Sequence, residues 1–281
     1  MPKVIIAGCG FLGEAAADFF SGQGWDVLGL CASSESAARL AAKPYRVVAT
    51  DISGALHIPM GWENPDLLIH CASSGRGQAE AYQAVYFTGL QNLLQVAKPR
   101  RVIFTSSTSV YSQTSGEWVM EDSETLPTRE TGKILLAAEA LALEAGGIAA
   151  RLAGLYGPGR SVLLRKFLSG DAVLEKGGER WINQIHRDDG ASALFHLADA
   201  PSGIYNVADN TPATQLTVYQ WMADHFDKPL PPAGEPDYNR KRGWTSKRVS
   251  NAKLRSLGWN PRFPSYQEAL VVSGLSLQAG T

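Results

Sequence analysis

The chain has 281 residues, and its 26 lysine and arginine residues nearly balance its 27 aspartate and glutamate residues. This balance gives no overall attraction to nucleic acid or to an anionic membrane. No apolar run approaches the roughly 18 residues of a membrane-spanning helix. We expect a cytoplasmic protein, because strand-like sequence starts too early to leave room for a signal peptide. The three cysteines are widely spaced and lack a C-x-x-C pair, so neither a disulfide framework nor a metal site is predicted.

An apolar strand pattern at residues 4–7 leads into a glycine-rich turn and then a helical pattern. Gly8, Gly10 and Gly13 have G-x-G-x-x-G spacing, which gives a tight turn, a close approach to a pyrophosphate and close helix–strand packing. Free N–H groups at the helix start, around Phe11 and Leu12, would bind the phosphates. We therefore predict a dinucleotide site; the alternative is that the glycines only shape a tight turn.

A second predicted strand, residues 25–30, ends where such folds select their cofactor. An acidic residue about 20 residues past the glycines would bind the ribose 2′-hydroxyl of NAD. This sequence instead has Ser33 and Ser34, with Arg39 about a turn further on. Hydroxyl and guanidinium groups accommodate a 2′-phosphate, so we predict NADP as the preferred cofactor and NAD as the alternative. Either serine could instead be only a helix N-cap.

Strand and helix patterns continue to alternate as far as residue 153. Strands are predicted at 45–49, 65–72, 101–105 and 148–153, and helices at 82–97 and from about 128 to 145. The run at 65–72 is almost continuously apolar, which is typical of a strand buried on both faces. The alternation favours an α/β fold with a Rossmann-like, doubly wound parallel sheet, in which ligands bind beyond the carboxyl ends of the strands.

The pattern loosens after Gly157, and we predict a second region from there. Residues 1–156 would form an NAD(P)-binding domain that also receives strands and a helix from about 182–208. Residues 157–281 would form a smaller substrate-binding region. The elements expected beyond this boundary are helices at 161–168, 189–197 and 250–257 and strands at 181–185 and 204–208.

Several motifs along the chain match those of one family. They are the glycine turn, Asp51-Ile52, HCA at 70–72, TSSTSVY at 105–111, RLAGLYGPG at 151–159 and IHRDD at 185–189. With these motifs, nearly the whole chain resembles the extended and atypical short-chain dehydrogenases/reductases, a group that includes the NAD-dependent sugar-nucleotide epimerases and dehydratases.

The resemblance implies roles for single residues. Asp51 and Ile52 would bracket the adenine, Ala72 would line the cofactor cleft, and Ser107 would hold the reacting oxygen of a small-molecule substrate. The smaller C-terminal region would cap the sheet and bind that substrate. In extended relatives the helices that correspond to 82–97 and 128–145 pair into a homodimer, which is therefore an expectation for this chain.

The chain departs from this family at the residues that carry its chemistry. The family uses a Tyr-x-x-x-Lys pair, in which the lysine charge favours the phenolate. Lys133 stands at the right place, but Arg129 lies four residues before it. A guanidinium does not exchange protons near neutral pH, so Arg129 does not replace the tyrosine. The chain also has Ala7 where extended members have their first glycine, and both departures indicate an atypical subgroup.

If the chain is an enzyme, another group must move the proton. We predict Tyr111, which follows the serine-rich loop, and we expect Lys133 to bind the ribose. His186 titrates in a useful range, but its sequence context favours Asp188 or Asp189 as a helix N-cap. The remaining alternatives are carboxylates between Tyr111 and the next helix: Glu117, Glu121 and Asp122.

Basic residues crowd a short stretch around Trp244. They are Arg240, Lys241, Arg242, Lys247 and Arg248. They could clamp an anionic substrate such as a nucleotide diphosphate. Because charge runs alone discriminate poorly between sites and surfaces, a solvated loop is the favoured interpretation.

Two functions remain open from the sequence. The first is an NAD(P)-dependent oxidoreductase of epimerase/dehydratase type that acts on a nucleotide sugar or another small hydroxyl or carbonyl compound. The second is a catalytically inactive NAD(P)-binding redox sensor or regulatory protein, which the missing tyrosine favours. Nucleic acid is not an expected partner, since the charge is balanced and no helix-turn-helix pattern is present.

Overall fold

A parallel sheet of seven strands forms the centre of the computed structural model, which describes residues 1–75, 77–238 and 243–273. The strand order is β12-β7-β5-β4-β1-β2-β3, and all neighbours are parallel. The strands are β1 (Lys3–Ala7), β2 (Asp26–Cys31), β3 (Arg46–Ala49), β4 (Leu67–His70), β5 (Val102–Ser107), β7 (Ile148–Leu152) and β12 (Gly203–Val207). The chain order reverses at β1, between β2 and β4, which is the topology of a doubly wound Rossmann-like sheet. The predicted fold class is confirmed.

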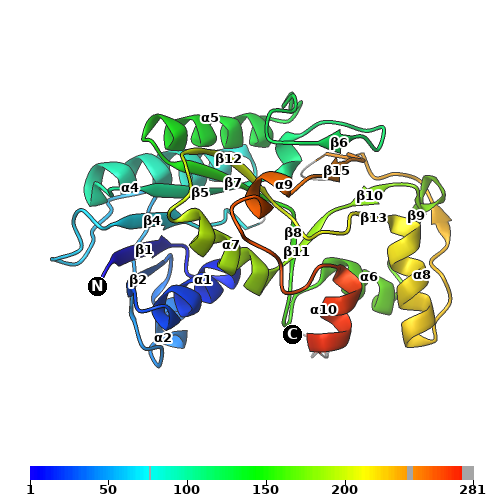
Figure 1. The fold of residues 1–281 in the computed structure, drawn as a ribbon, viewed down its shortest axis with the longest axis horizontal. Helices are drawn as coiled ribbons and strands as arrows, with labels where there is room; N and C mark the ends of the chain where they lie inside the picture. The colour runs from blue at the N-terminus through cyan, green and yellow to red at the C-terminus, as the bar shows by residue number, and fades with distance from the viewer. Residues whose placement is uncertain (76, 239–242, 274–281) are drawn as a thin grey trace.

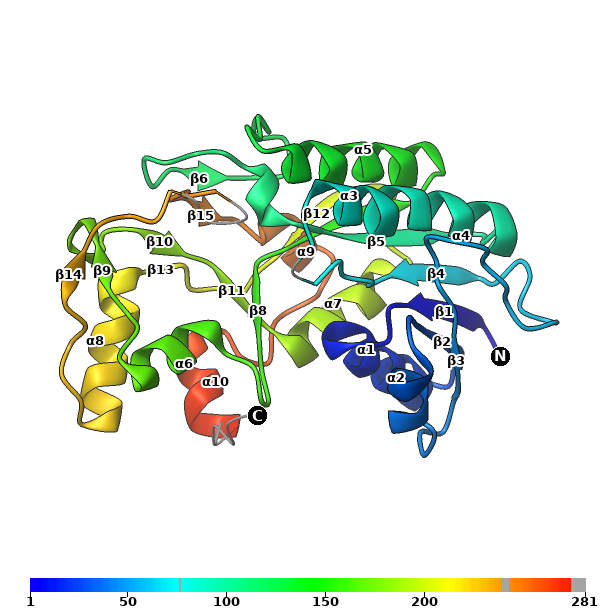
Figure 2. The same cartoon turned by 180° about the vertical axis from the view of Figure 1, so that it is seen from behind.

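Helices cover both faces of this sheet (Figure 1). α1, α2 and α7 lie on one face, and α3, α4 and α5 lie on the other, as the view from behind also shows (Figure 2). Their bounds are α1 (Phe11–Gly22), α2 (Ser34–Arg39), α3 (Ala79–Tyr82), α4 (Gly89–Ala97), α5 (Glu130–Glu144) and α7 (Arg187–Leu197). Because helices pack on both sides, β4, β5 and β7 are buried along their whole length, which explains their apolar sequences.

The helix predicted at 82–97 contains a π-helical turn, Gln83–Thr88, between α3 and α4. π-helical turns are rare in proteins, and those that occur often lie at functional sites. Here it brings the Val85 carbonyl to the ring of His70, whose Nε2 donates to it at 3.0 Å. The π-helical turn therefore ties this helix to the end of β4.

A second hydrophobic cluster lies beside the sheet, on the right in Figure 1. It is built from α6 (Val162–Ser169), α8 (Gln215–Phe226) and α10 (Tyr266–Ser273). Of these helices, the sequence analysis predicted α6 alone. Short strand pairs accompany this cluster: β8 (Gly154–Tyr156) with β11 (Gln184–His186), β9 (Leu174–Glu175) with β14 (Ala233–Gly234), and β10 (Trp181–Ile182) with β13 (Ala213–Thr214).

After residue 243 the chain returns to the first part of the molecule. β15 (Arg248–Val249) pairs with β6 (Trp118–Val119), and α9 (Ala252–Arg255) packs on β12. Leu254 and Trp259 are buried in the core of the large sheet. The helix predicted at 250–257 is thus a single turn that closes this core. None of the helices in the described ranges has the length and apolar character needed to span a membrane.

Candidate functional site

The carboxyl ends of β1, β2, β4 and β5 open into a cleft of about 390 Å³. It lies at the point where the strand order reverses, which is where open α/β sheets bind their ligands. Most of the residues predicted for the cofactor line this cleft: Gly8, Gly10, Phe11, Leu12, Arg39, Asp51, Ile52 and Ala72.

Packing requires glycine at two positions of the turn after β1. Gly8 has φ +92°, and a Cβ atom there would lie 2.3 Å from the backbone of Ala72. A Cβ atom on Gly13 would lie 2.1 Å from the carbonyl oxygen of Gly8. Gly13 therefore serves helix–strand packing and does not line the cleft. Gly10 has open space where its Cβ would be, so a ligand can approach the backbone at the start of α1.

The end of β2 differs from the prediction in its serines. Ser33 is the N-cap of α2, and its Oγ accepts a hydrogen bond from the Ser36 amide at 3.2 Å. Ser33 and Ser34 do not line the cleft, whereas Ser36 and Arg39 do. The N-cap alternative is correct for Ser33, because the hydroxyl satisfies an amide that has no partner within the helix. Ser36 is the hydroxyl residue at this edge of the cleft.

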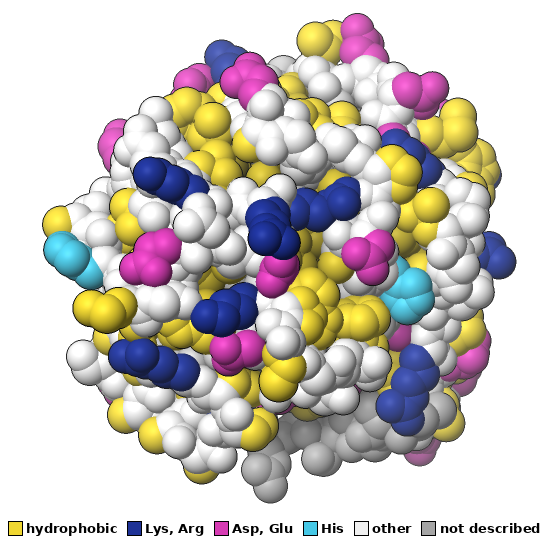
Figure 3. Space-filling view, turned by 60° about the vertical axis from the view of Figure 1, so that its left-hand side comes forward, with side chains coloured by type: hydrophobic (Ala, Val, Ile, Leu, Met, Phe, Trp, Pro, Cys, Tyr) yellow, Lys and Arg dark blue, Asp and Glu magenta, His cyan; other side chains and the backbone are white. Residues whose placement is uncertain are grey.

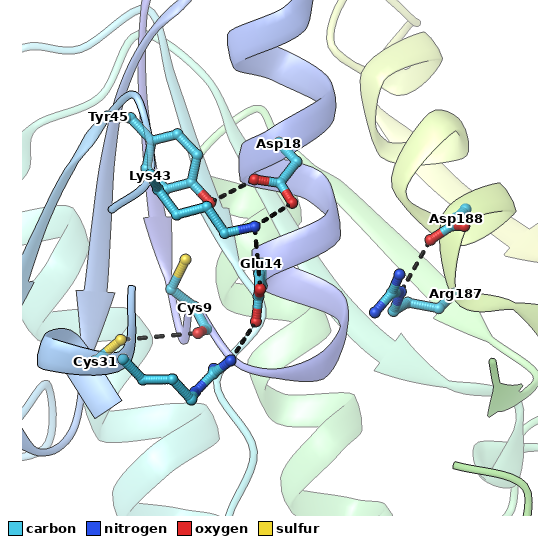
Figure 4. A network of polar contacts seen from close by, with 9 residues as sticks. Cys9, Glu14, Asp18, Cys31, Lys43, Tyr45, Arg187 and Asp188 are labelled. Carbon is cyan, nitrogen blue, oxygen red and sulfur yellow. Dashed lines mark hydrogen bonds and ion pairs between the residues drawn. The ribbon is translucent and has the colours of Figure 1, made fainter. Parts of the chain in front are cut away.

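Arg39 is held at the cleft by a network that reaches α1. Its Nη1 donates to Glu14 Oε2 at 2.8 Å, while Lys43 bridges Glu14 at 3.2 Å and Asp18 at 2.7 Å. Figure 4 shows Lys43 between these two carboxylates, with the hydroxyl of Tyr45 on Asp18. Burial raises the pKa of Glu14, but hydrogen bonds from Arg39 and Lys43 outweigh it, and the pKa is lowered. The Arg39 side chain remains 57% exposed, so it can still meet a ligand.

A second cavity of about 400 Å³ adjoins the cleft. Ser107 and Ala153 line both spaces. Ser107 ends β5, and its Oγ accepts from the Ser109 amide at 3.2 Å, which starts a 3-10 turn over Thr108–Val110. The predicted substrate-binding serine therefore stands where the two spaces meet.

Tyr111 does not take the place predicted for it. Its phenol is fully buried and donates to Asn206 Oδ1 at 2.8 Å, and its ring lies 4.8 Å from the Arg151 guanidinium. It lines neither cavity, and burial raises its pKa. The phenol thus has a structural role, because it is buried against Asn206 of β12 and Arg151 of β7.

Lys133 also lies away from the cleft. Its side chain is 60% exposed and forms an ion pair with Glu130 at 3.2 Å, one turn away on α5. It lines neither cavity, so the expected contact with the ribose is not formed by this geometry. Arg129 faces another direction, with Nη2 donating to the carbonyl of Tyr238 at 2.8 Å. The reason is that α5 begins only at Glu130, so these two residues do not share a helix face.

The other residues predicted for proton transfer also lie outside the two cavities. None of Glu117, Glu121, Asp122 and His186 lines either cavity. His186 itself caps α7, with Nδ1 accepting from the Asp188 amide at 3.3 Å, so the predicted aspartate N-cap is wrong. Asp189 instead accepts from the amides of Arg262 and Phe263 at 2.7 and 3.0 Å.

Comparison with known proteins assigns the chain to a family. The model of the NAD dependent epimerase/dehydratase family matches residues 4–208. The chain belongs to this family. Protein YeeZ of Escherichia coli K12 is 32% identical over 241 residues, which cover 79% of this chain and 83% of that protein.

Solved structures agree with this membership. A protein of Methylobacillus flagellatus, provisionally described as an NAD-dependent epimerase/dehydratase, has 30% identity and a TM-score of 0.77 over 97% of both chains. MoeE5, solved in complex with UDP-glucose and NAD, has 23% identity and a TM-score of 0.75 over 96% of this chain and 97% of its own. At that identity the likeness to MoeE5 concerns the fold alone.

In this epimerase/dehydratase family member, the sequence analysis did not name the cleft residue Arg160, and it favoured a solvated loop for the stretch that contains Lys247. Arg160 lines the cleft with its guanidinium 4.9 Å from the ring of Phe11, at the start of α1. Lys247 lines the second cavity and is only 4% exposed. Both lie far from the glycine turn in the sequence, so no local motif places them at the cavities.

The solvated-loop interpretation of the basic stretch is wrong for its last two members. Lys247 is buried, and Arg248 packs its guanidinium against the rings of Trp118 and Trp181 at 5.2 and 4.9 Å. Arg248 Nε also donates to the Gly116 carbonyl at 2.7 Å. The other three basic residues, at 240–242, lie outside the described residues.

Proposed function

We propose that the chain is an NAD(P)-dependent oxidoreductase of epimerase/dehydratase type that acts on a nucleotide sugar or another small hydroxyl or carbonyl compound. The observation that carries this proposal is the meeting of the cleft and the second cavity at Ser107. A cofactor in the first space and a substrate in the second would touch there. The complex of MoeE5 with UDP-glucose and NAD is an example of this pairing in a protein of the same fold.

The residues of the cleft fit a dinucleotide. Gly10 leaves the start of α1 open to a pyrophosphate, where free N–H groups attract an anion. The Arg160 guanidinium beside Phe11 adds a positive charge to the same place. Asp51 and Ile52 would hold the adenine, and the cofactor would supply hydride transfer. Ser107 would orient the substrate oxygen from which or to which the proton moves.

NADP is the cofactor we favour. No acidic side chain from the end of β2 lines the cleft, whereas Ser36 and Arg39 do. A carboxylate there would repel a 2′-phosphate, and a guanidinium attracts one. The pair between Arg39 and Glu14 keeps the guanidinium at this edge of the cleft.

A titration of the protein with NADPH and with NADH, followed by quenching of its seven tryptophans, tests the cofactor site. We expect tighter binding of NADPH, and we expect Arg39→Ala to weaken NADPH binding roughly 10- to 100-fold with little effect on NADH. Lys43→Ala is the matched control, because Lys43 pairs with the same Glu14 but does not line the cleft. A wild-type preference for NADH would contradict the NADP assignment, and binding of neither cofactor would contradict the site itself.

The alternative of a catalytically inactive NAD(P)-binding sensor keeps specific support. Tyr111 is enclosed and Lys133 is on the surface, so these two predicted catalytic residues do not reach the cavities, and of the predicted three only Ser107 does. A sensor would change its shape or its self-association when cofactor binds. Small-angle scattering and sedimentation with and without NADPH measure this, and they also test the expected homodimer. Identical profiles in both conditions would argue against a sensor.

A further inference from the structure

The second cavity contains a buried primary amine on a fixed backbone. Lys247 directly precedes β15, and Asn183 holds the chain on both sides of it. Asn183 Nδ2 donates to the Lys247 carbonyl at 2.9 Å, and Asn183 Oδ1 accepts from the Val249 amide at 2.7 Å. The Ser246 amide donates to the Gln113 carbonyl at 3.1 Å. The backbone around Lys247 is therefore held by two separate segments, those of Asn183 and Gln113.

The amine makes two hydrogen bonds inside the protein. Nζ donates to the Tyr111 carbonyl at 2.8 Å and to Thr245 Oγ1 at 2.9 Å. An ammonium group has three donors, so one N–H remains for a molecule in the cavity. Tyr111 follows the 3-10 turn that Ser107 caps, and Ser107 lines the same cavity as Lys247. No carboxylate forms an ion pair with Lys247 within residues 1–75, 77–238 and 243–273.

Charged groups on five segments act on this amine or line its cavity. Arg180 Nε donates to the Thr245 carbonyl at 2.9 Å, so a guanidinium stands close by. The negative charge of Glu117, in the loop before β6, raises the pKa of Lys247. Lys166, Glu175 and Asp237 line the cavity. Burial and the Arg180 charge lower the pKa of Lys247 to about 7, against the smaller opposite effect of Glu117. Near neutral pH the amine can therefore both accept and release a proton, which Arg180 cannot do.

We propose that Lys247 is the residue that exchanges a proton with the substrate oxygen, the task for which the family tyrosine is missing here. The inference rests on the proposed function. In the oxidation of a hydroxyl, the carbon-bound hydrogen leaves with its electron pair to the oxidised nicotinamide. The hydroxyl proton passes to the neutral amine of Lys247, and a C=O bond forms. Reduction returns the proton from the ammonium group to the oxygen.

The first test measures the amine itself without any reaction. Protein labelled with 13C at the lysine ε-carbons is titrated from about pH 5.5 to 10 by NMR, and the signal missing from Lys247→Met is assigned to Lys247. We expect its midpoint near pH 7. A Lys247 signal that stays in the charged form beyond pH 9 overturns the inference.

The second test separates proton transfer from a structural role. With a substrate found by hydride transfer, Lys247→Ala should slow the reaction about 100-fold or more and should abolish the change of rate around pH 7. Added primary amines should restore part of the rate, and more basic amines should restore more. Binding of NADPH should persist, because Lys247 does not line the cleft. Lys228→Met, on the surface outside both cavities, is the control and should match the wild type.

The outcomes distinguish the inference from the proposed function. Equal hydride transfer and equal pH profiles in Lys247→Ala and the wild type overturn the role of Lys247 and leave the proposed function intact. A slow variant that no amine rescues assigns Lys247 a structural role and also overturns the inference. A wild-type protein that binds cofactor but transfers no hydride contradicts the proposed function, and it removes the reaction on which the inference rests.

Discussion

Single residues were predictable where their role is local. The spacing of Gly8, Gly10 and Gly13 specifies a turn, and the structure shows why Gly8 and Gly13 tolerate no side chain. Tyr111 and Lys133 were misassigned because their sequence positions say nothing about burial or about where α5 begins. Lys247 lies 140 residues after Ser107 in the chain numbering, and only the tertiary structure brings it to the same cavity.

His70 gives a prediction about pH. Burial lowers the pKa of its imidazole to about 4, compared with about 6.5 in an unfolded chain. Between these values the unfolded chain takes up a proton that the folded chain does not. The stabilising contribution of the neutral ring is therefore complete above about pH 6.5 and is lost as the pH falls toward 4.

For the wild type, this effect removes about 2 kcal/mol of the free energy of unfolding between pH 7 and pH 5. Urea unfolding at the two pH values measures it. In His70→Gln, which keeps an N–H donor for the Val85 carbonyl, the drop should shrink by that amount. His57→Gln, at an exposed position, should behave like the wild type. An unchanged drop in His70→Gln would mean that the ring is not held neutral by burial.

Elements of the sheet were predicted well because their signals repeat along the chain. Most strands of the large sheet are apolar runs that alternate with helices, and the parallel order follows from that alternation, although no helix separates β3 from β4. α8 and α10 were missed because they belong to a separate hydrophobic cluster. No glycine turn or strand pattern in the sequence marks them. The return of the chain through β15 and α9 depends on long-range pairing with β6 and β12.

This return gives a prediction about stability. Leu254 on α9 is fully buried in the core of the large sheet. It comes late in the chain, after the helix α8 of the second cluster. Leu254→Ala should lower the free energy of unfolding by about 2–5 kcal/mol, because it leaves a cavity in a packed core. Leu257→Ala is the control, since Leu257 is 39% exposed, and it should cost less than about 1 kcal/mol. Equal effects of the two substitutions in urea unfolding would show that α9 does not close this core.

At the scale of the whole molecule, two adjoining cavities lie at the carboxyl ends of the strands of one sheet. Figure 3 shows basic and acidic side chains interspersed over one face of the surface, as the balanced composition suggests. The cations that line the cavities include Arg39, Arg160, Arg180 and Lys247. Composition could not identify these residues, because the positive charges of the whole chain are balanced by its negative charges.

The measurement that tests the account most directly is hydride transfer at the junction of the two cavities. Nicotinamide absorbance is followed with wild type and Ser107→Ala, in both reaction directions, across nucleotide sugars and other small hydroxyl and carbonyl compounds. We predict a cofactor-dependent change with at least one compound, slowed about 100-fold in Ser107→Ala while cofactor affinity is retained. A wild-type protein that binds the cofactor and leaves its absorbance unchanged with every compound would contradict the account and favour the sensor.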